Sequence, residues 1–69
     1  MDRVPVSSRA IASVGYNAEL ELLEVEFTRG AIYEYCAVPS ETYEELMASE
    51  SLGTYFNQFI KDSFQYNQL

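Results

Sequence analysis

The stretch ELELLEVEFTRGAIYEYCAV, residues 19–38, contains two apolar–polar alternating runs that are separated by a glycine. Alternation over residues 19–27 is typical of a strand with one buried face. The alternation changes phase at Leu22-Leu23, which indicates a bulge or bend there. Residues 31–38 carry Tyr33 and Tyr35 on one side and form the second predicted strand. The stretch therefore predicts an antiparallel β-hairpin.

The loop of this hairpin decides which side chains face each other. A two-residue loop would place the acidic Glu34 opposite Val25. A three-residue loop, in which Gly30 adopts a left-handed conformation, places Tyr33 opposite Val25 instead. Only the three-residue loop gathers the apolar side chains on one face, so we predict it. Glu24 then lies opposite Glu34, and this like-charge pair requires water or a cation nearby.

Two short helices are predicted after the hairpin, which ends at Pro39. Ser40 is expected to cap a helix that begins at Glu41, and Ser51 to cap a second one. The second has the strongest helical period of the chain, with apolar residues at Leu52, Tyr55, Phe56, Phe59 and Ile60.

Upstream of the hairpin, residues 11–16 suggest a first strand after an extended lead-in, with a turn at residues 17–18. The fold class predicted is α+β: a small antiparallel meander of two or three strands packed against two C-terminal α-helices, in a single domain of residues 1–69.

Length and composition exclude several classes of protein. The chain has 69 residues, no histidine and one cysteine, Cys36, so histidine-based catalysis, histidine–metal sites and internal disulfides are ruled out. It has neither a signal-peptide pattern nor the roughly 20 apolar residues of a membrane span. We therefore expect a cytoplasmic, non-enzymatic protein without a cofactor or a membrane partner. A chain this short buries little surface, so we also expect a homo-oligomer.

The formal charge of −7 is concentrated in one part of the chain. Residues 17–48 hold eight acids and one base, whereas the two flanks hold three acids and three bases. The middle segment would repel a long polyanion, so double-stranded DNA is not an expected partner. We interpret the strand glutamates as solvated surface.

Several short motifs together resemble the KTSC domain family, and the resemblance covers nearly the whole chain. They are Ser7-Ser8, the Val-Gly-Tyr of residues 14–16, Tyr33-x-Tyr35, Val38-Pro39 and Ser51-x-Gly53-x-Tyr55-Phe56-Asn57. The resemblance implies a domain that occurs at the C-terminus of some lysine-tRNA synthetases and as small single-domain proteins. It also implies RNA binding, which has been suggested for the family, although the acidic composition of this chain departs from that suggestion.

A ligand site is predicted between the hairpin tyrosines and the start of the last helix. Tyrosine rings on a sheet can stack a nucleobase, and the first amides of a helix favour an anion. The alternative is structural: the tyrosines form the core, and the serine is an ordinary cap. The predicted site comprises Ser8, Arg9, Tyr33, Tyr35, Ser51, Gly53, Tyr55, Asn57 and Lys61.

Three functions remain open from the sequence. The first is a binding module that sequesters or senses a small nucleotide-like ligand, which suits the acidic chain better than a long polyanion does. The second is an RNA-binding module. It would depend on stacking of the nucleobases, because the four basic side chains of the chain would release few counterions. The third is an adaptor whose acidic hairpin face, with Ile32, binds a basic protein.

Overall fold

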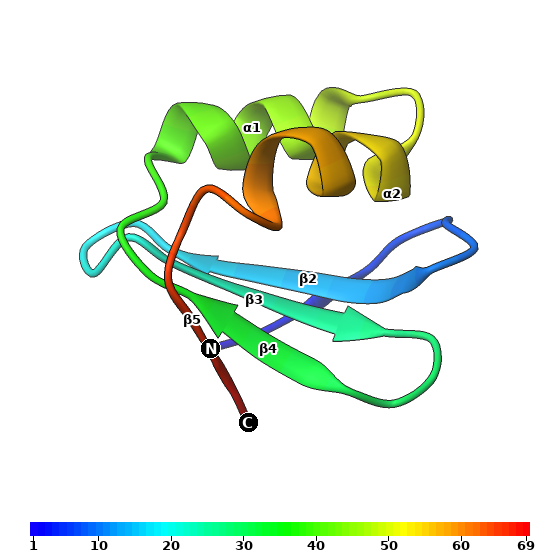
Figure 1. Cartoon of the computed structure of the whole chain (residues 1–69), viewed down its shortest axis with the longest axis horizontal. Helices are drawn as coiled ribbons and strands as arrows, with labels where there is room; N and C mark the ends of the chain where they lie inside the picture. The colour runs from blue at the N-terminus through cyan, green and yellow to red at the C-terminus, as the bar shows by residue number, and fades with distance from the viewer.

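The computed structural model describes residues 1–69 and shows a five-stranded antiparallel sheet with helices over one face (Figure 1). The strands are adjacent in chain order, as β1 (Val4–Pro5), β2 (Ile11–Asn17), β3 (Leu22–Phe27), β4 (Ile32–Tyr35) and β5 (Tyr66–Gln68). The helical layer consists of α1 (Ser40–Ala48), α2 (Leu52–Tyr55) and the π-helix η1 (Phe56–Ile60), which continues from α2. The α+β class is confirmed.

The prediction of two or three strands was wrong, because both edge strands were missed. β1 lies in the expected lead-in, where Val4 pairs with Val14 and Pro5 occupies an edge position. β5 lies in the C-terminal tail, where Tyr66 pairs with Tyr35. Both strands are short and solvent-exposed along their whole length, so neither has the alternation that marks a half-buried strand.

The predicted register of the central hairpin is confirmed. Val25 pairs with Tyr33 and Leu23 with Tyr35. The Phe27 amide donates to the Ala31 carbonyl over 2.8 Å, and Gly30 has a φ of 104°. A three-residue loop with a left-handed glycine therefore closes the hairpin.

The phase change in the glutamate-rich run marks a turn and not a bulge in the strand, which corrects the prediction. Residues 18–21 form the turn, and Glu21 adopts a left-handed φ of 54°. Leu20 is 64% exposed and its amide donates to the Asn17 side chain. The strand begins only at Leu22, and the register irregularity lies in β2, between Ile11 and Ser13. The second hairpin strand is also shorter than expected, because Ala37 is left-handed.

The helices differ from the prediction at two places. Ser40 lies inside α1, which follows Pro39 with no side-chain cap, so the predicted Ser40 cap was wrong. Ser51 does cap α2, since its oxygen accepts from the Thr54 amide over 3.3 Å. Phe59 is 53% exposed instead of joining the apolar stripe. The wider turn of η1 aligns Phe56 with Ile60 and rotates Phe59 outward.

The core lies between the sheet and the helices, and its members are Ile11, Val14, Leu23, Val25, Tyr35, Val38, Leu46, Phe56 and Ile60. On the opposite face Glu24 does lie across from Glu34. The cation that this pair requires is Arg3, which forms an ion pair with Glu24 and donates to Ser13 over 3.0 Å. The N-terminal residues thereby cover Gly15 on the outer face of β2.

Candidate functional site

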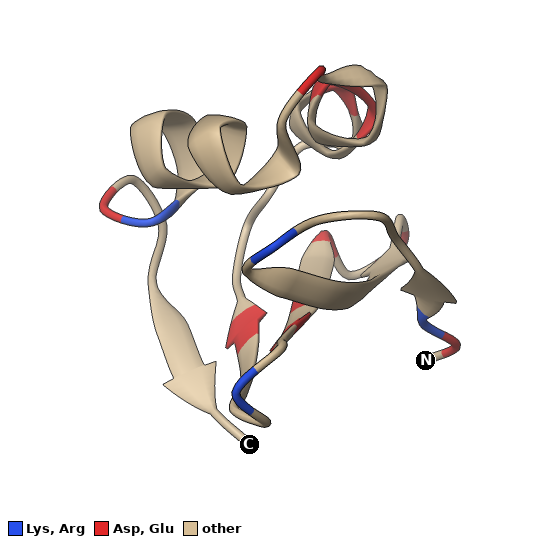
Figure 2. Cartoon of the chain, turned by 90° about the vertical axis from the view of Figure 1, so that its right-hand side faces the viewer, with Lys and Arg blue, Asp and Glu red and all other residues tan.

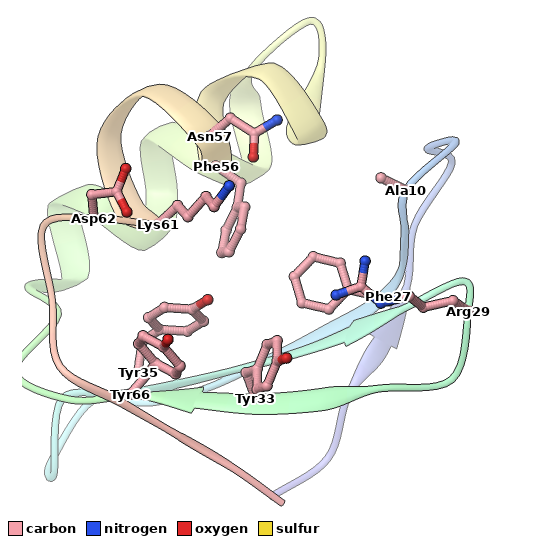
Figure 3. A pocket seen from close by; sticks show the side chains of 10 residues that line it. All are labelled: Ala10, Phe27, Arg29, Tyr33, Tyr35, Phe56, Asn57, Lys61, Asp62 and Tyr66. Atoms are coloured by element: carbon pink, nitrogen blue, oxygen red, sulfur yellow. The ribbon is translucent and has the colours of Figure 1, made fainter.

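A cavity of about 370 Å³ opens between the hairpin side of the sheet and η1 (Figure 3). Figure 3 shows Phe56, Asn57 and Lys61 on the helical side of the gap, and the three tyrosines on the sheet side. The complete lining is Ala10, Phe27, Arg29, Tyr33, Tyr35, Phe56, Asn57, Lys61, Asp62 and Tyr66. Half of these residues are aromatic, and this volume lies in the range of small-molecule sites.

Strand periodicity positions the aromatic floor. Tyr33 and Tyr35 are two residues apart on β4 and so share its inner face. Tyr66 joins them from β5, with its ring centroid 5.5 Å from each. Phe56 contacts this group from η1, with its ring centroid 5.3 Å from those of both Tyr35 and Phe27. These contacts fix the rings in place while leaving one side of the group open to the cavity.

The Tyr35 ring is part of the hydrophobic core, whereas its hydroxyl lies at the wall of the cavity. The residue is only 3% exposed, but its oxygen forms no hydrogen bond with the protein. No fully enclosed side-chain oxygen in the chain lacks a partner, so the Tyr35 oxygen must be reachable from the cavity. Burial, followed by the proximity of Tyr66, Tyr33 and Asp62, raises the pKa of Tyr35 to about 12. The phenol is therefore protonated at neutral pH and can donate a hydrogen bond.

Basic side chains gather at this side of the molecule although the chain is strongly acidic. Arg29 and Lys61 line the cavity with one acid, Asp62. The Arg29 guanidinium is held over the Phe27 ring at 5.3 Å by a cation–π contact. Figure 2 shows many of the acidic residues elsewhere, on α1 and along the middle strands of the sheet. The charge at the cavity is thus opposite to that of the whole chain.

A second hollow of about 260 Å³ adjoins the cavity and shares Ala10 and Asn57 with it. Five predicted site residues line this hollow, namely Ser8, Arg9, Ser51, Gly53 and Asn57. The hydroxyls are engaged within the chain, because Ser8 accepts from the Ile11 amide and Ser51 from the Thr54 amide. A Cβ on Gly53 would meet its nearest atom at 3.8 Å, so no close approach requires glycine there.

The predicted site residues therefore divide into two neighbouring groups. Tyr33, Tyr35 and Lys61 line the aromatic cavity, and Asn57 borders both spaces. Tyr55 lies outside both: its hydroxyl donates to Glu45 of α1 over 2.7 Å, and its ring contacts Phe59. Burial, and then this hydrogen bond, raise the pKa of Tyr55.

No helix has the length and apolar character needed to cross a membrane.

The family model described as the KTSC domain matches residues 7–64. The chain belongs to the KTSC domain family. A solved KTSC domain protein from Yersinia pestis superposes with a TM-score of 0.94 and 35% identity, covering 99% of this chain and 96% of the other.

Two kinds of relative share this KTSC domain. A protein from Stutzerimonas stutzeri is 48% identical over 88% of this chain and 86% of its own length. The lysine–tRNA ligase of Trichormus variabilis is 44% identical over 78% of this chain, but the match covers only 10% of that enzyme. The KTSC domain is thus found both as nearly a whole small protein and as a minor part of a tRNA ligase.

Sequence reasoning missed six of the ten residues that line the cavity of this KTSC domain. Phe56 was assigned only to the helix stripe, whereas Phe27 and Arg29 were seen only as parts of the hairpin. Tyr66 and Asp62 lie in a tail for which no element was predicted. One signal was available: Arg29 is the only base of the acidic segment and directly precedes the turn glycine. The tail offers no comparable signal, since β5 is recognisable only from its pairing with β4.

Proposed function

We propose that the chain is a non-enzymatic binding module for a small nucleotide-like ligand, which it holds in the aromatic cavity for sequestration or sensing. The observation that carries this proposal is an aromatic cavity with two cations in a chain of net charge −7. Aromatic faces bind a planar base, and basic side chains balance a phosphate. The distant acids weaken this attraction little, because salt screens exposed charges beyond about 8 Å.

The size of the cavity favours a small guest over a polymer. About 370 Å³ is near the lower end of the range of small-molecule sites. The chain also has only four basic residues, which is few for a stripe that would follow a nucleic-acid backbone. We further propose that the chain self-associates, because 69 residues bury a small core and Phe59 leaves apolar surface exposed.

Native mass spectrometry of protein purified from its own host tests this proposal, since it reports a retained ligand and the subunit count together. We expect an added mass of a few hundred daltons, on the order of a ligand that fits this cavity. Ala10→Trp should abolish the added mass, because Ala10 borders the cavity and a large ring there fills it. The matched control is Ala48→Trp, at the exposed end of α1. Absence of the added mass, together with no binding of added mononucleotides, would contradict the proposal.

RNA binding is the second candidate, and the similarity to a lysine–tRNA ligase favours it. In that case the cavity would hold one unstacked base of a single strand. We would then expect a short single-stranded RNA to bind more tightly than a mononucleotide, with an affinity that falls steeply with salt. Fluorescence anisotropy at two salt concentrations measures both quantities. Equal or weaker binding of the RNA would exclude this candidate.

The adaptor function receives less support than the other two. It requires a free acidic surface on the outer face of the hairpin, but Arg3 already pairs with Glu24 there. The Ser13 hydroxyl donates to Glu26 over 2.8 Å, which engages a second carboxylate. Glu34→Lys tests the remaining acid: loss of a basic partner during co-purification would support an adaptor, and unchanged recovery would contradict it.

A further inference from the structure

One hydroxyl at the wall of the cavity has no hydrogen-bond partner within the chain. Tyr16 donates to the Val38 carbonyl over 2.6 Å and Tyr55 donates to Glu45, as tyrosine hydroxyls near the interior usually do. The Tyr35 ring is more deeply buried than either, yet its hydroxyl forms no hydrogen bond within the chain. A hydroxyl that is carried by a buried ring and reachable from the cavity is free to form a hydrogen bond with a guest there.

The fixed position of the Tyr35 ring makes its hydroxyl a selective donor. Phe56 and Tyr33 contact the ring edge to face, with interplanar angles of 80° and 86°, and Tyr66 contacts it at 36°. The ring cannot turn its oxygen toward another partner without disturbing this group. A guest that offers no acceptor there would leave the hydroxyl dehydrated and unpaired, which disfavours it.

The charges at the cavity distinguish between two guests that aromatic sites bind. Rings around an open centre can hold a quaternary ammonium ion by cation–π contacts. Arg29 and Lys61 would repel such an ion, and only Asp62 would attract it. Arg29 already occupies the Phe27 ring in a cation–π contact. A planar anion is favoured instead, because the aromatic rings can contact its plane and Arg29 and Lys61 attract its negative charge.

We propose that the Tyr35 hydroxyl determines specificity by donating a hydrogen bond to an acceptor atom of a nucleoside monophosphate, whose phosphate is balanced by Arg29 and Lys61. This inference rests on the proposed function and narrows it to one residue and one ligand class. Tyr33 and Tyr66 contact the base, and the hydroxyl recognises an oxygen or ring nitrogen.

Calorimetric titration with the four nucleoside 5′-monophosphates, the matching nucleosides and choline tests the inference. We expect Tyr35→Phe to weaken binding of the preferred monophosphate by about five- to tenfold, as loss of one hydrogen bond implies. Tyr43→Phe is the matched control, because Tyr43 stacks on Tyr16 outside the cavity. The double variant Arg29→Gln/Lys61→Gln should bind the monophosphate no better than the nucleoside.

The outcomes separate the inference from the proposed function. Equal affinity of the wild-type protein and Tyr35→Phe would overturn the role of the hydroxyl while leaving the binding module intact. Tighter binding of choline than of any monophosphate would overturn the ligand class. No binding of any monophosphate would overturn both. A ¹³Cζ-tyrosine NMR titration of the wild-type protein gives a readout that needs no variant: the Tyr35 signal should shift with the monophosphate, and an unmoved signal would contradict the inference.

Discussion

Gly15 and Gly53 look alike in the sequence but differ in the room around them. A Cβ on Gly15 would lie 2.9 Å from the backbone oxygen of Asp2 and 3.0 Å from Cγ of Arg3. Gly15→Val should therefore displace the N-terminal residues, disrupt the ion pair with Glu24 and lower the free energy of unfolding by about 1–3 kcal/mol.

Gly53→Ala is the matched comparison, because its Cβ meets only ordinary contacts at 3.8 Å or more. It should raise the free energy of unfolding by about 0.5 kcal/mol through helix propensity. Urea unfolding measures both variants, and equal effects of the two would contradict this interpretation.

Tyr35 should make the fold sensitive to high pH. Its pKa of about 12 in the folded chain exceeds the ordinary value of 10.0, so folding favours the protonated phenol. That stabilisation is fully present below pH 10 and is lost as the pH rises through 12. Because solvent in the cavity screens the phenolate, we expect the free energy of unfolding to fall by on the order of 1 kcal/mol over this range from this residue. Urea unfolding at several pH values should show a flatter dependence for Tyr35→Phe than for the wild type; an identical pH dependence would show that this phenol is not coupled to folding.

At the scale of elements, the hairpin loop depends on backbone conformation alone. Gly30 has a φ of 104°, and a Cβ there would meet no atom within 4 Å. Gly30→Ala should therefore lower the free energy of unfolding by about 1 kcal/mol, solely because a residue with a side chain is strained at this positive φ. Ala37 has a φ of 58°, so Ala37→Gly should have the opposite sign and stabilise the chain by up to about 1 kcal/mol. Thermal unfolding compares the two, and changes of the same sign would be inconsistent with this explanation.

The elements that could be predicted from the sequence are those with one buried face and one face exposed to solvent. Tyr33 and Val25 alternate with glutamates, so the central hairpin and its register follow from the pattern. Pro5 and Tyr66 lie in edge strands whose residues are all largely exposed, so only hydrogen bonding to a neighbour defines each strand. The π-helix was also unpredictable, because residues 56–60 fit an α-helical period just as well.

The same distinction applies to the site. The predicted site residues that line the cavity are Tyr33, Tyr35, Asn57 and Lys61. Each lies on, or directly after, an element that the sequence pattern identified. Tyr66 was missed with its strand. Tyr55 was also predicted as a site residue, but it lines neither hollow, and its hydroxyl donates to Glu45.

At the scale of the whole molecule, the arrangement of charge separates two surfaces. Arg3 neutralises part of the acidic outer face of the sheet, whereas Arg29 and Lys61 lie at the cavity between sheet and helices. If the cavity is the binding site, the outer face should be indifferent to the ligand. Residues at the cavity therefore report ligand binding, and residues on the outer face of the sheet serve as the internal control.

A ¹H–¹⁵N NMR titration of the wild-type protein with a nucleoside 5′-monophosphate tests cavity binding most directly. We predict saturable shifts at the cavity residues Tyr33, Asn57, Lys61 and Tyr66, while Gly15 on the outer face stays unmoved. Saturable shifts confined to the outer face, or no shifts with any of the four monophosphates at millimolar concentration, would contradict it.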